Sequence, residues 1–175
     1  LPAGLVSICS HAFSCCDSLV SVTFPAGLTS IGDDGFSDCS SLVSVTLPAS
    51  LTSIGGNAFD GCSALARVIL PAGLTSIGDC AFFNCSSLAS VALPLPDGLS
   101  IGDDAFFDCP LNDEATAAVQ AINFWAVRPP IDAQGHATVP EGLTTIASSA
   151  FYGCDSPVSV TLPPGRTSLG PTALS

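Results

Sequence analysis

Cysteine is the residue type with the greatest potential for chemistry in this sequence, which holds nine of them among 175 residues. Six of them recur at one position of a repeating pattern, mostly 23 residues apart: Cys16, Cys39, Cys62, Cys85, Cys109 and Cys154. Strands of a parallel sheet lie about 5 Å apart and their equivalent side chains point the same way. That arrangement suits stacked thiols and does not suit disulfide geometry. We therefore expect these six cysteines to be buried, reduced and structural.

We call these six stacked positions the cysteine ladder. Three further cysteines, Cys9, Cys15 and Cys80, lie outside it. We expect free thiols at all three, because Cys15 directly precedes Cys16 and a bond between them would be strained. A thiol reagent should reach these positions in the folded protein, and Cys80 before the others.

Metal binding and catalysis find little support in the remaining residues. Zinc sites need closely spaced pairs of ligands, often with histidine, whereas His11 and His136 are the only histidines and lie in separate regions. A cysteine nucleophile needs a base within hydrogen-bond reach. The repeated glycines precede no lysine that would bind a phosphate, since the sequence has no lysine. We therefore predict a protein that is not an enzyme and holds no cofactor or metal.

Carboxylates recur at one turn of the pattern, at Asp33, Asp34, Asp79, Asp103 and Asp104. We expect these side chains to face outward and to form a solvated acidic edge. Calcium binding is an alternative, because calcium favours oxygen-rich sites. The glycine–aspartate nonapeptide of calcium-binding β-rolls is absent, however.

The charge balance excludes several classes of partner. The net charge is −12, and the only cations besides histidine are Arg67, Arg128 and Arg166. Nucleic-acid binding needs clustered cations, and an anionic membrane surface is disfavoured for the same reason. No apolar run approaches the length of about 18 residues that crosses a bilayer, so we expect no membrane span. The sequence begins inside a repeat without a signal-peptide pattern, which indicates a piece of a longer protein.

A 23-residue period organises the chain. Leu-Pro or its equivalent begins at residues 1, 24, 47, 70, 93, 139 and 162, and isoleucine, phenylalanine and cysteine recur in phase with it. Aligned apolar positions at such a period are typical of a solenoid, in which each coil is buried against its neighbours. Within one coil, residues 42–47 predict a strand stopped by Pro48. Residues 51–54 predict a second short extended segment, and residues 58–62 a helical or 3₁₀ turn.

The pattern L-x-x-V-x-L-P-x-x-L-x-x-I-G-x-x-A-F-x-x-C resembles the BspA-like leucine-rich repeats, also called the Treponema pallidum type. The resemblance covers nearly the whole chain and weakens only between about Pro110 and Thr138. It implies a mainly β, right-handed leucine-rich-repeat solenoid with short parallel strands. It also implies a cell-surface or secreted protein used for adhesion and protein–protein contact.

One coil departs from the pattern, so we divide the predicted single array into regular coils over 1–110, an interrupted coil over 111–138, and regular to decaying coils over 139–175. Aligning the interruption places Val119 in the leucine slot and Ile122 in the isoleucine slot. Alanines dominate its first part, which favours a helix from about Asp113 to Ile122, capped by Asn112 or Asp113. This helix should replace one strand.

The interrupted coil also supplies the candidate contact residues. Phe124 and Trp125 occupy slots that hold aspartates in other coils, and Arg128 follows closely. Tryptophan and arginine are enriched at interface hot spots. The candidate contact residues are therefore Phe124, Trp125 and Arg128, together with Arg67 on another coil. The alternative is that Trp125 folds inward and fills the space left by the missing phenylalanine and cysteine.

Outward strand positions are the remaining candidate. Serine and threonine alternate there at Ser21 and Thr23, Ser44 and Thr46, and Ser159 and Thr161, but Arg67 interrupts the array. A flat hydroxyl array is similar to ice-binding β-helices, whereas the interruption and the family resemblance favour contact with a protein. The favoured function is a non-enzymatic protein-binding or adhesion module with an unidentified protein partner. A structural spacer within a longer array is the main alternative, and the oligomeric state is not predicted.

Overall fold

The computed structural model describes residues 1–123, together with Ala126, Asp132, Gln134, 136–139, 145–146, 159–161 and 168–169. The chain divides into two compact units, Leu1–Val127 and Arg128–Ser175, and each is described by itself.

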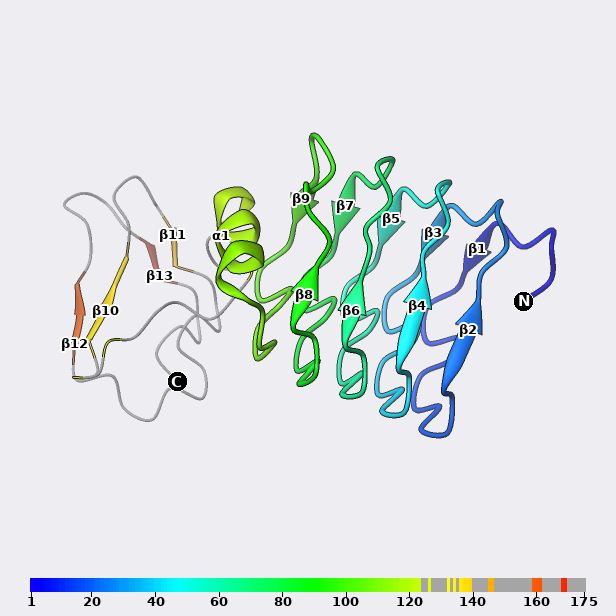
Figure 1. Ribbon diagram of the computed structural model, residues 1–175, viewed down its shortest axis with the longest axis horizontal. Coiled ribbons are helices and arrows are strands. Elements are labelled where there is room, and N and C mark those ends of the chain that lie inside the picture. Colours follow the sequence, from blue (N-terminus) through cyan, green and yellow to red (C-terminus); the bar gives the residue numbers. More distant parts are fainter. Residues whose placement is uncertain are drawn as a thin grey trace. The chain divides into compact units, whose positions relative to one another are not determined.

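The first unit is a parallel β-solenoid with two columns of short strands (Figure 1). One column is a five-stranded sheet in which isoleucine pairs with isoleucine from coil to coil, from Ile8↔Ile31 to Ile77↔Ile101. Its strands are β1 (Ser7–Ile8), β3 (Ser30–Ile31), β5 (Ser53–Ile54), β7 (Ser76–Ile77) and β9 (Ser100–Ile101). The other column contains β2 (Ser21–Thr23), β4 (Ser44–Thr46), β6 (Arg67–Val68) and β8 (Ser90–Val91). The predicted solenoid, with its parallel strands, is confirmed.

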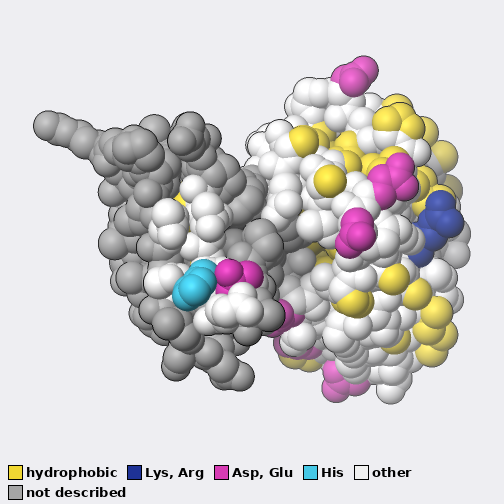
Figure 2. All heavy atoms as spheres, turned by 60° about the vertical axis from the view of Figure 1, so that its left-hand side comes forward, with side chains coloured by type: hydrophobic (Ala, Val, Ile, Leu, Met, Phe, Trp, Pro, Cys, Tyr) yellow, Lys and Arg dark blue, Asp and Glu magenta, His cyan; other side chains and the backbone are white. Residues whose placement is uncertain are grey.

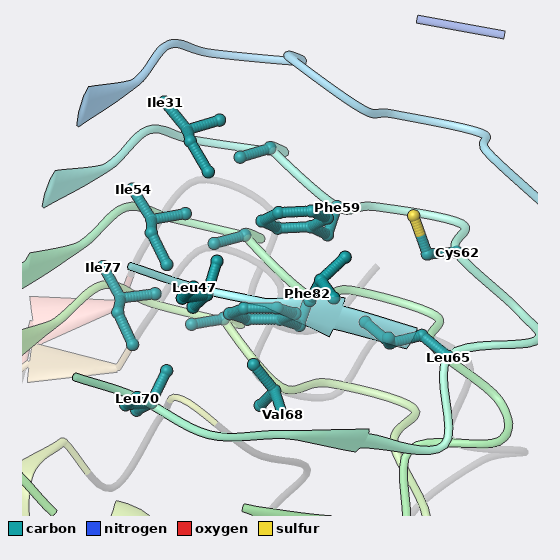
Figure 3. Packing of buried hydrophobic residues seen from close by; sticks show 14 of the residues in the cluster. Ile31, Leu47, Ile54, Phe59, Cys62, Leu65, Val68, Leu70, Ile77 and Phe82 are labelled. Carbon is teal, nitrogen blue, oxygen red and sulfur yellow. The ribbon is translucent and has the colours of Figure 1, made fainter. Parts of the chain in front are cut away.

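Identical side chains stack into ladders between the two columns. The rings of Phe36 and Phe59 lie 5.4 Å apart, and those of Phe59 and Phe82 lie 5.2 Å apart, in both cases within 6° of parallel. All three rings are fully buried. Ile31, Ile54 and Ile77 follow one another beside them (Figure 3). The ring spacing is close to the separation of hydrogen-bonded strands, because each coil repeats the one before it in register.

The glycine that follows Ile31, Ile54, Ile77 and Ile101 lets neighbouring coils approach closely. A Cβ atom added at Gly78 would lie 2.5 Å from the backbone nitrogen of Gly56 on the preceding coil. No real Cβ tolerates such a contact with a backbone atom, so a larger residue would push the two coils apart.

Two residues in each of the five coils over 1–110 adopt a left-handed backbone conformation between the columns. In one coil these are Asn57 and Gly61, with φ of 52° and 67°. The hydrogen bonds from Asp60 N to Asn57 O and from Cys62 N to Phe59 O have the i→i+3 spacing of a 3₁₀ turn. The predicted 3₁₀-type corner is therefore a series of tight turns separated by left-handed residues. Aspartate, asparagine and glycine favour this conformation, and they fill most of these positions: His11, Asp34, Asn57, Cys80 and Asp104, and Cys15, Asp38, Gly61, Asn84 and Asp108.

The helix α1 (Asp113–Ile122) lies next in line after β8, where the pattern would place another strand (Figure 1). The side chain of Asn112 caps it by accepting a hydrogen bond from Ala115 N at 2.9 Å. The backbone N–H of Asn112 still donates to Ala89 O at 3.0 Å, as a strand residue would. Ala115 and Val119 are buried. The predicted helix, its bounds and its cap are confirmed.

The second unit contains the same two kinds of strand. The strands β10 (His136–Thr138) and β12 (Ser159–Thr161) pair in parallel, with His136 opposite Ser159. The strands β11 (Thr145–Ile146) and β13 (Ser168–Leu169) form the other pair. A single array through both units remains a prediction. In the part of the chain that the structure describes, no helix is long and apolar enough to cross a membrane.

Candidate functional site

The strand face is the outward surface of β2, β4, β6 and β8 with the residues directly before and after these strands. It consists of three positions in each of four coils: Val20, Ser21 and Thr23; Val43, Ser44 and Thr46; Ala66, Arg67 and Ile69; and Ala89, Ser90 and Ala92. All twelve are exposed or half-exposed. Equivalent positions form columns across the face, because the strands pair in register, as Ser21↔Ser44 and Arg67↔Ser90 do.

Buried residues hold this face in place from below. Leu42, Leu65 and Leu88 precede β4, β6 and β8, and all three are fully buried. The central strand residues Val45 and Val68 also point into the core. Side chains alternate along a strand, so burying these residues forces their polar and β-branched neighbours outward.

Three large aliphatic side chains are exposed on the strand face. Val20 is 57% exposed, Val43 51% and Ile69 58%, which makes them among the most exposed large hydrophobic residues of the described chain. Figure 2 shows hydrophobic side chains reaching the surface around the dark-blue arginine. Exposed aliphatic side chains gathered on one face are candidates for contact with other molecules.

The strand face also carries no carboxylate, although the chain has 15 acidic residues and a net charge of −12. Its only charged side chain is that of Arg67, on β6. Cores of protein interfaces are depleted in charged residues and enriched in arginine and large apolar groups. The face therefore shares two features of an interface core, the scarcity of charged residues and the presence of an arginine.

Of the four predicted contact residues, Arg67 lies exposed on the strand face. Phe124, Trp125 and Arg128 lie outside the described residues, so a contact cluster there remains a prediction, as does the inward alternative for Trp125. The sequence interpretation missed Val20 and Val43. The signal was an apolar residue directly before the first serine of β2 and β4.

Three ladder thiols are buried and hydrogen-bonded between coils. The sulfurs of Cys39, Cys62 and Cys85 each lie 3.2 Å from the carbonyl oxygen of a phenylalanine on the preceding coil, and the three side chains are fully buried. Burial raises the pKa of Cys39 to about 11 and that of Cys62 to about 12. A hydrogen bond with Cys109 and burial together raise the pKa of Cys85. The prediction of buried, reduced thiols is confirmed for these three.

At the ends of the ladder, Cys16 and Cys109 are half-buried, and Cys154 lies outside the described residues. The predicted order of thiol exposure outside the ladder is wrong. Cys9 and Cys15 are exposed, whereas Cys80 is only partly exposed. Burial and the nearby Asp104 raise the pKa of Cys80 to about 11, so its thiolate is scarce at neutral pH.

The acidic turns link neighbouring coils. The carboxylate of Asp33 accepts a hydrogen bond from Gly56 N at 2.8 Å, and that of Asp79 accepts one from Asp103 N at 3.0 Å. Burial, with Asp38 and Asp34 nearby, raises the pKa of Asp60 to about 6. These contacts give the acidic turns a structural role in addition to their charge.

One residue of the predicted acidic edge is not exposed. Asp104 was expected to face outward but is only 5% exposed. The coil that carries α1 covers this part of the chain, because the side chain of Asn123 donates to Ile101 O and Phe106 N donates to Ala126 O.

Two histidine–aspartate pairs lie among the described residues. Nδ1 of His11 lies 3.8 Å from Oδ2 of Asp34, and Nδ1 of His136 lies 3.4 Å from Oδ2 of Asp132. Among the described residues, no group of three or more histidines, cysteines or acids is placed to hold a metal ion.

Solved structures of leucine-rich repeat proteins are similar to this chain. A T. pallidum leucine-rich repeat protein is 31% identical with a TM-score of 0.63, and the match covers 97% of this chain and 71% of that one. A Bacteroides ovatus leucine-rich repeat protein is 22% identical with a TM-score of 0.54, covering 100% of this chain and 63% of that one. The pneumococcal vaccine antigen PcpA is 18% identical with a TM-score of 0.55, covering 89% of this chain and 48% of that one. The last two likenesses show the fold alone.

No curated protein matches the chain in sequence. The family model described as the BspA type leucine-rich repeat region matches six copies over residues 1–118 and 134–175. That match covers most of the chain and agrees with the stacked coils and their isoleucine and phenylalanine ladders. The chain therefore belongs to the BspA-type leucine-rich repeat family.

Proposed function

We propose that the chain is a non-enzymatic protein-binding or adhesion module whose strand face contacts its partner. The observation that carries this proposal is the absence of carboxylates from the twelve positions of that face, in a chain of net charge −12. Membership of a leucine-rich repeat family supports it, because such repeats commonly mediate protein interaction. A cell-surface or secreted location, which the family resemblance implies, fits the same function.

The centre of the proposed contact is the region of Val43, Arg67 and Ile69. All three side chains are exposed, on or beside the adjacent strands β4 and β6. Burial of two β-branched side chains supplies apolar area, and the guanidinium group supplies several hydrogen-bond donors. Both β-branched side chains are stiff at χ1, so little conformational entropy is lost when a partner covers them.

The experiment compares single substitutions on the strand face with a matched control. The immobilised protein is screened against an array of secreted and cell-surface proteins, and each binder is measured again with Val43→Asp and Arg67→Glu. Ala72→Asp is the control, because it adds a carboxylate at an exposed turn whose equivalent in the next coil is Asp97.

We expect Val43→Asp and Arg67→Glu to weaken binding by tenfold or more, and Ala72→Asp to change it by less than twofold. If neither substitution changes the affinity of a binder, its contact lies elsewhere on the chain. A screen that finds no binder above background would favour the structural spacer.

A further inference from the structure

A groove of about 770 Å³ lies between the loop 93–99 and the helix α1. Leu93, Leu95 and Asp97 line it from the loop, and Glu114, Ala118 and Ile122 line it from the helix. None of these residues belongs to the strand face, which the groove adjoins where Leu93 follows Ala92.

Both walls of the groove are departures from the 23-residue repeat. In the preceding coil the turn closed by Leu74 N and Pro71 O begins three residues after Val68. The equivalent turn, closed by Leu99 N and Pro96 O, begins five residues after Val91. The loop is therefore two residues longer at this point, and the opposite wall is the helix that replaces a strand.

The groove exposes aliphatic side chains that a closed core would bury. Leu93 is 36% exposed and Ile122 is 39% exposed. The equivalent of Leu93 in the preceding coil, Leu70, is only 8% exposed. The longer loop has thus brought apolar surface out to solvent beside the helix, where a partner can cover it.

The charges along the groove have one sign. Asp97 and Glu114 are both exposed, and no cation lies among the described residues that line the groove. Figure 2 shows carboxylates beside hydrophobic side chains on the described surface. Acidic groups next to an apolar strip select a partner in which cations flank an apolar side chain.

We propose that this groove docks a peptide segment of a partner protein in which lysine or arginine flanks leucine or a similar aliphatic residue. Burial of the aliphatic side chain against Leu93 and Ile122 drives binding. The carboxylates of Asp97 and Glu114 attract the flanking cations and disfavour acidic segments. This docking is independent of the strand face.

The test uses a short, capped, fluorescein-labelled peptide of alternating lysine and leucine, with binding followed by fluorescence polarisation. Asp97→Asn and Glu114→Gln should each weaken binding by about two- to five-fold, the range expected for an exposed ion pair. Asp113→Asn is the matched control, since it removes the same charge from the same helical turn but does not line the groove. It should change binding by less than two-fold.

The apolar part is tested with Ile122→Ser and with a second peptide in which serine replaces leucine. Each change should weaken binding by five-fold or more, while circular dichroism shows that the helix is retained. The proposal is overturned if the serine peptide binds as tightly as the leucine peptide, or if Asp113→Asn weakens binding as much as Glu114→Gln does. Either result would mean that an acidic protein attracts a cationic peptide without using the groove. Val43→Asp should leave peptide binding unchanged, so failure here and failure of the strand face are told apart.

Discussion

The sulfur of Cys62 lies 3.2 Å from the carbonyl oxygen of Phe36 on the preceding coil. Cys39 with Phe13 and Cys85 with Phe59 make the same contact at the same distance. A thiol is therefore both a small hydrophobic group and a weak donor at this position. The carbonyl oxygens of Phe36 and Phe59 already accept from backbone N–H groups, and the thiols give them a second partner without the cost of burying a hydroxyl or an amide.

The buried thiols of the ladder should not react with thiol reagents in the folded protein. Brief native labelling followed by peptide mass spectrometry should modify Cys9 and Cys15, which are exposed, and leave Cys39, Cys62 and Cys85 unmodified. Burial and the raised thiol pKa values both suppress reaction at the ladder. Labelling in denaturant is the control and should modify every cysteine. Native modification of Cys62 at the rate of Cys9 would contradict the ladder.

Truncating one phenylalanine of the ladder should destabilise the protein strongly. Phe59→Ala removes a fully buried ring that stacks on two others and should cost about 3–5 kcal/mol of unfolding free energy. Denaturant unfolding measures this loss. Phe13→Ala, at a half-buried ring that stacks on one neighbour, is the control and should cost clearly less. Equal losses at the two positions would mean that burial between coils is not what stabilises Phe59.

Stability should depend on the protonation of Asp60. Its pKa is about 6 in the folded protein, against 3.8 for an ordinary aspartate, so folding strengthens proton binding. The contribution of this group to stability is therefore complete below about pH 4 and is lost as the pH rises through 6. Because Asp60 is half-exposed, solvent screening limits the effect to about 1 kcal/mol.

The variant Asp60→Asn tests this pH dependence. It should be more stable than the natural protein by about 1 kcal/mol at pH 7 and equally stable near pH 4, as measured by thermal unfolding across that range. Asp17→Asn removes the same charge from an exposed position on the first coil and controls for net charge. A constant gain at every pH would argue against the raised pKa.

The contribution of the N-cap of helix α1 to stability should be measurable apart from that of the packing of the helix. Asn112→Ala removes the oxygen that accepts from Ala115 N and should cost about 1 kcal/mol. Asn112→Asp keeps an acceptor and should restore most of that loss. Chemical unfolding compares the two variants, and an equal loss in both would exclude capping as the cause.

The repeat could be predicted in detail because side chains that stack on their equivalents must be of the same type in each coil. Residues that touch their own equivalents in the next coil, such as Ile31 with Ile54 or Phe36 with Phe59, must keep one size and shape. Their spacing in the sequence therefore reports the register directly. The helix could be predicted equally well, because Asn112 favours the N-cap position and the alanines that follow it favour a helix. Neither preference depends on tertiary contacts.

The left-handed turns were not recognised from the sequence. Asp34, Asn57 and Cys80 share a backbone conformation and not a side chain, so no single residue type marks the position. The charge of the aspartates at these positions predicts only an exposed acidic edge, although backbone preference also accounts for them. The groove could not be predicted from the sequence for a different reason. It arises where a lengthened loop and a helix face each other across space, and neither shows this in its own residues.

The in-register pairing of the coils has a mechanical consequence. The hydrogen bonds between paired strands run across the strands, from each coil to the next, and Ser30 pairs with Ser53 one full repeat further on. Tension applied along that direction loads one row of bonds at a time, so coils should peel from an end in succession. Each lost coil would release a contour length of roughly 80 Å. A chain anchored at both ends would in this way lengthen stepwise under load and limit the force that reaches a bound partner.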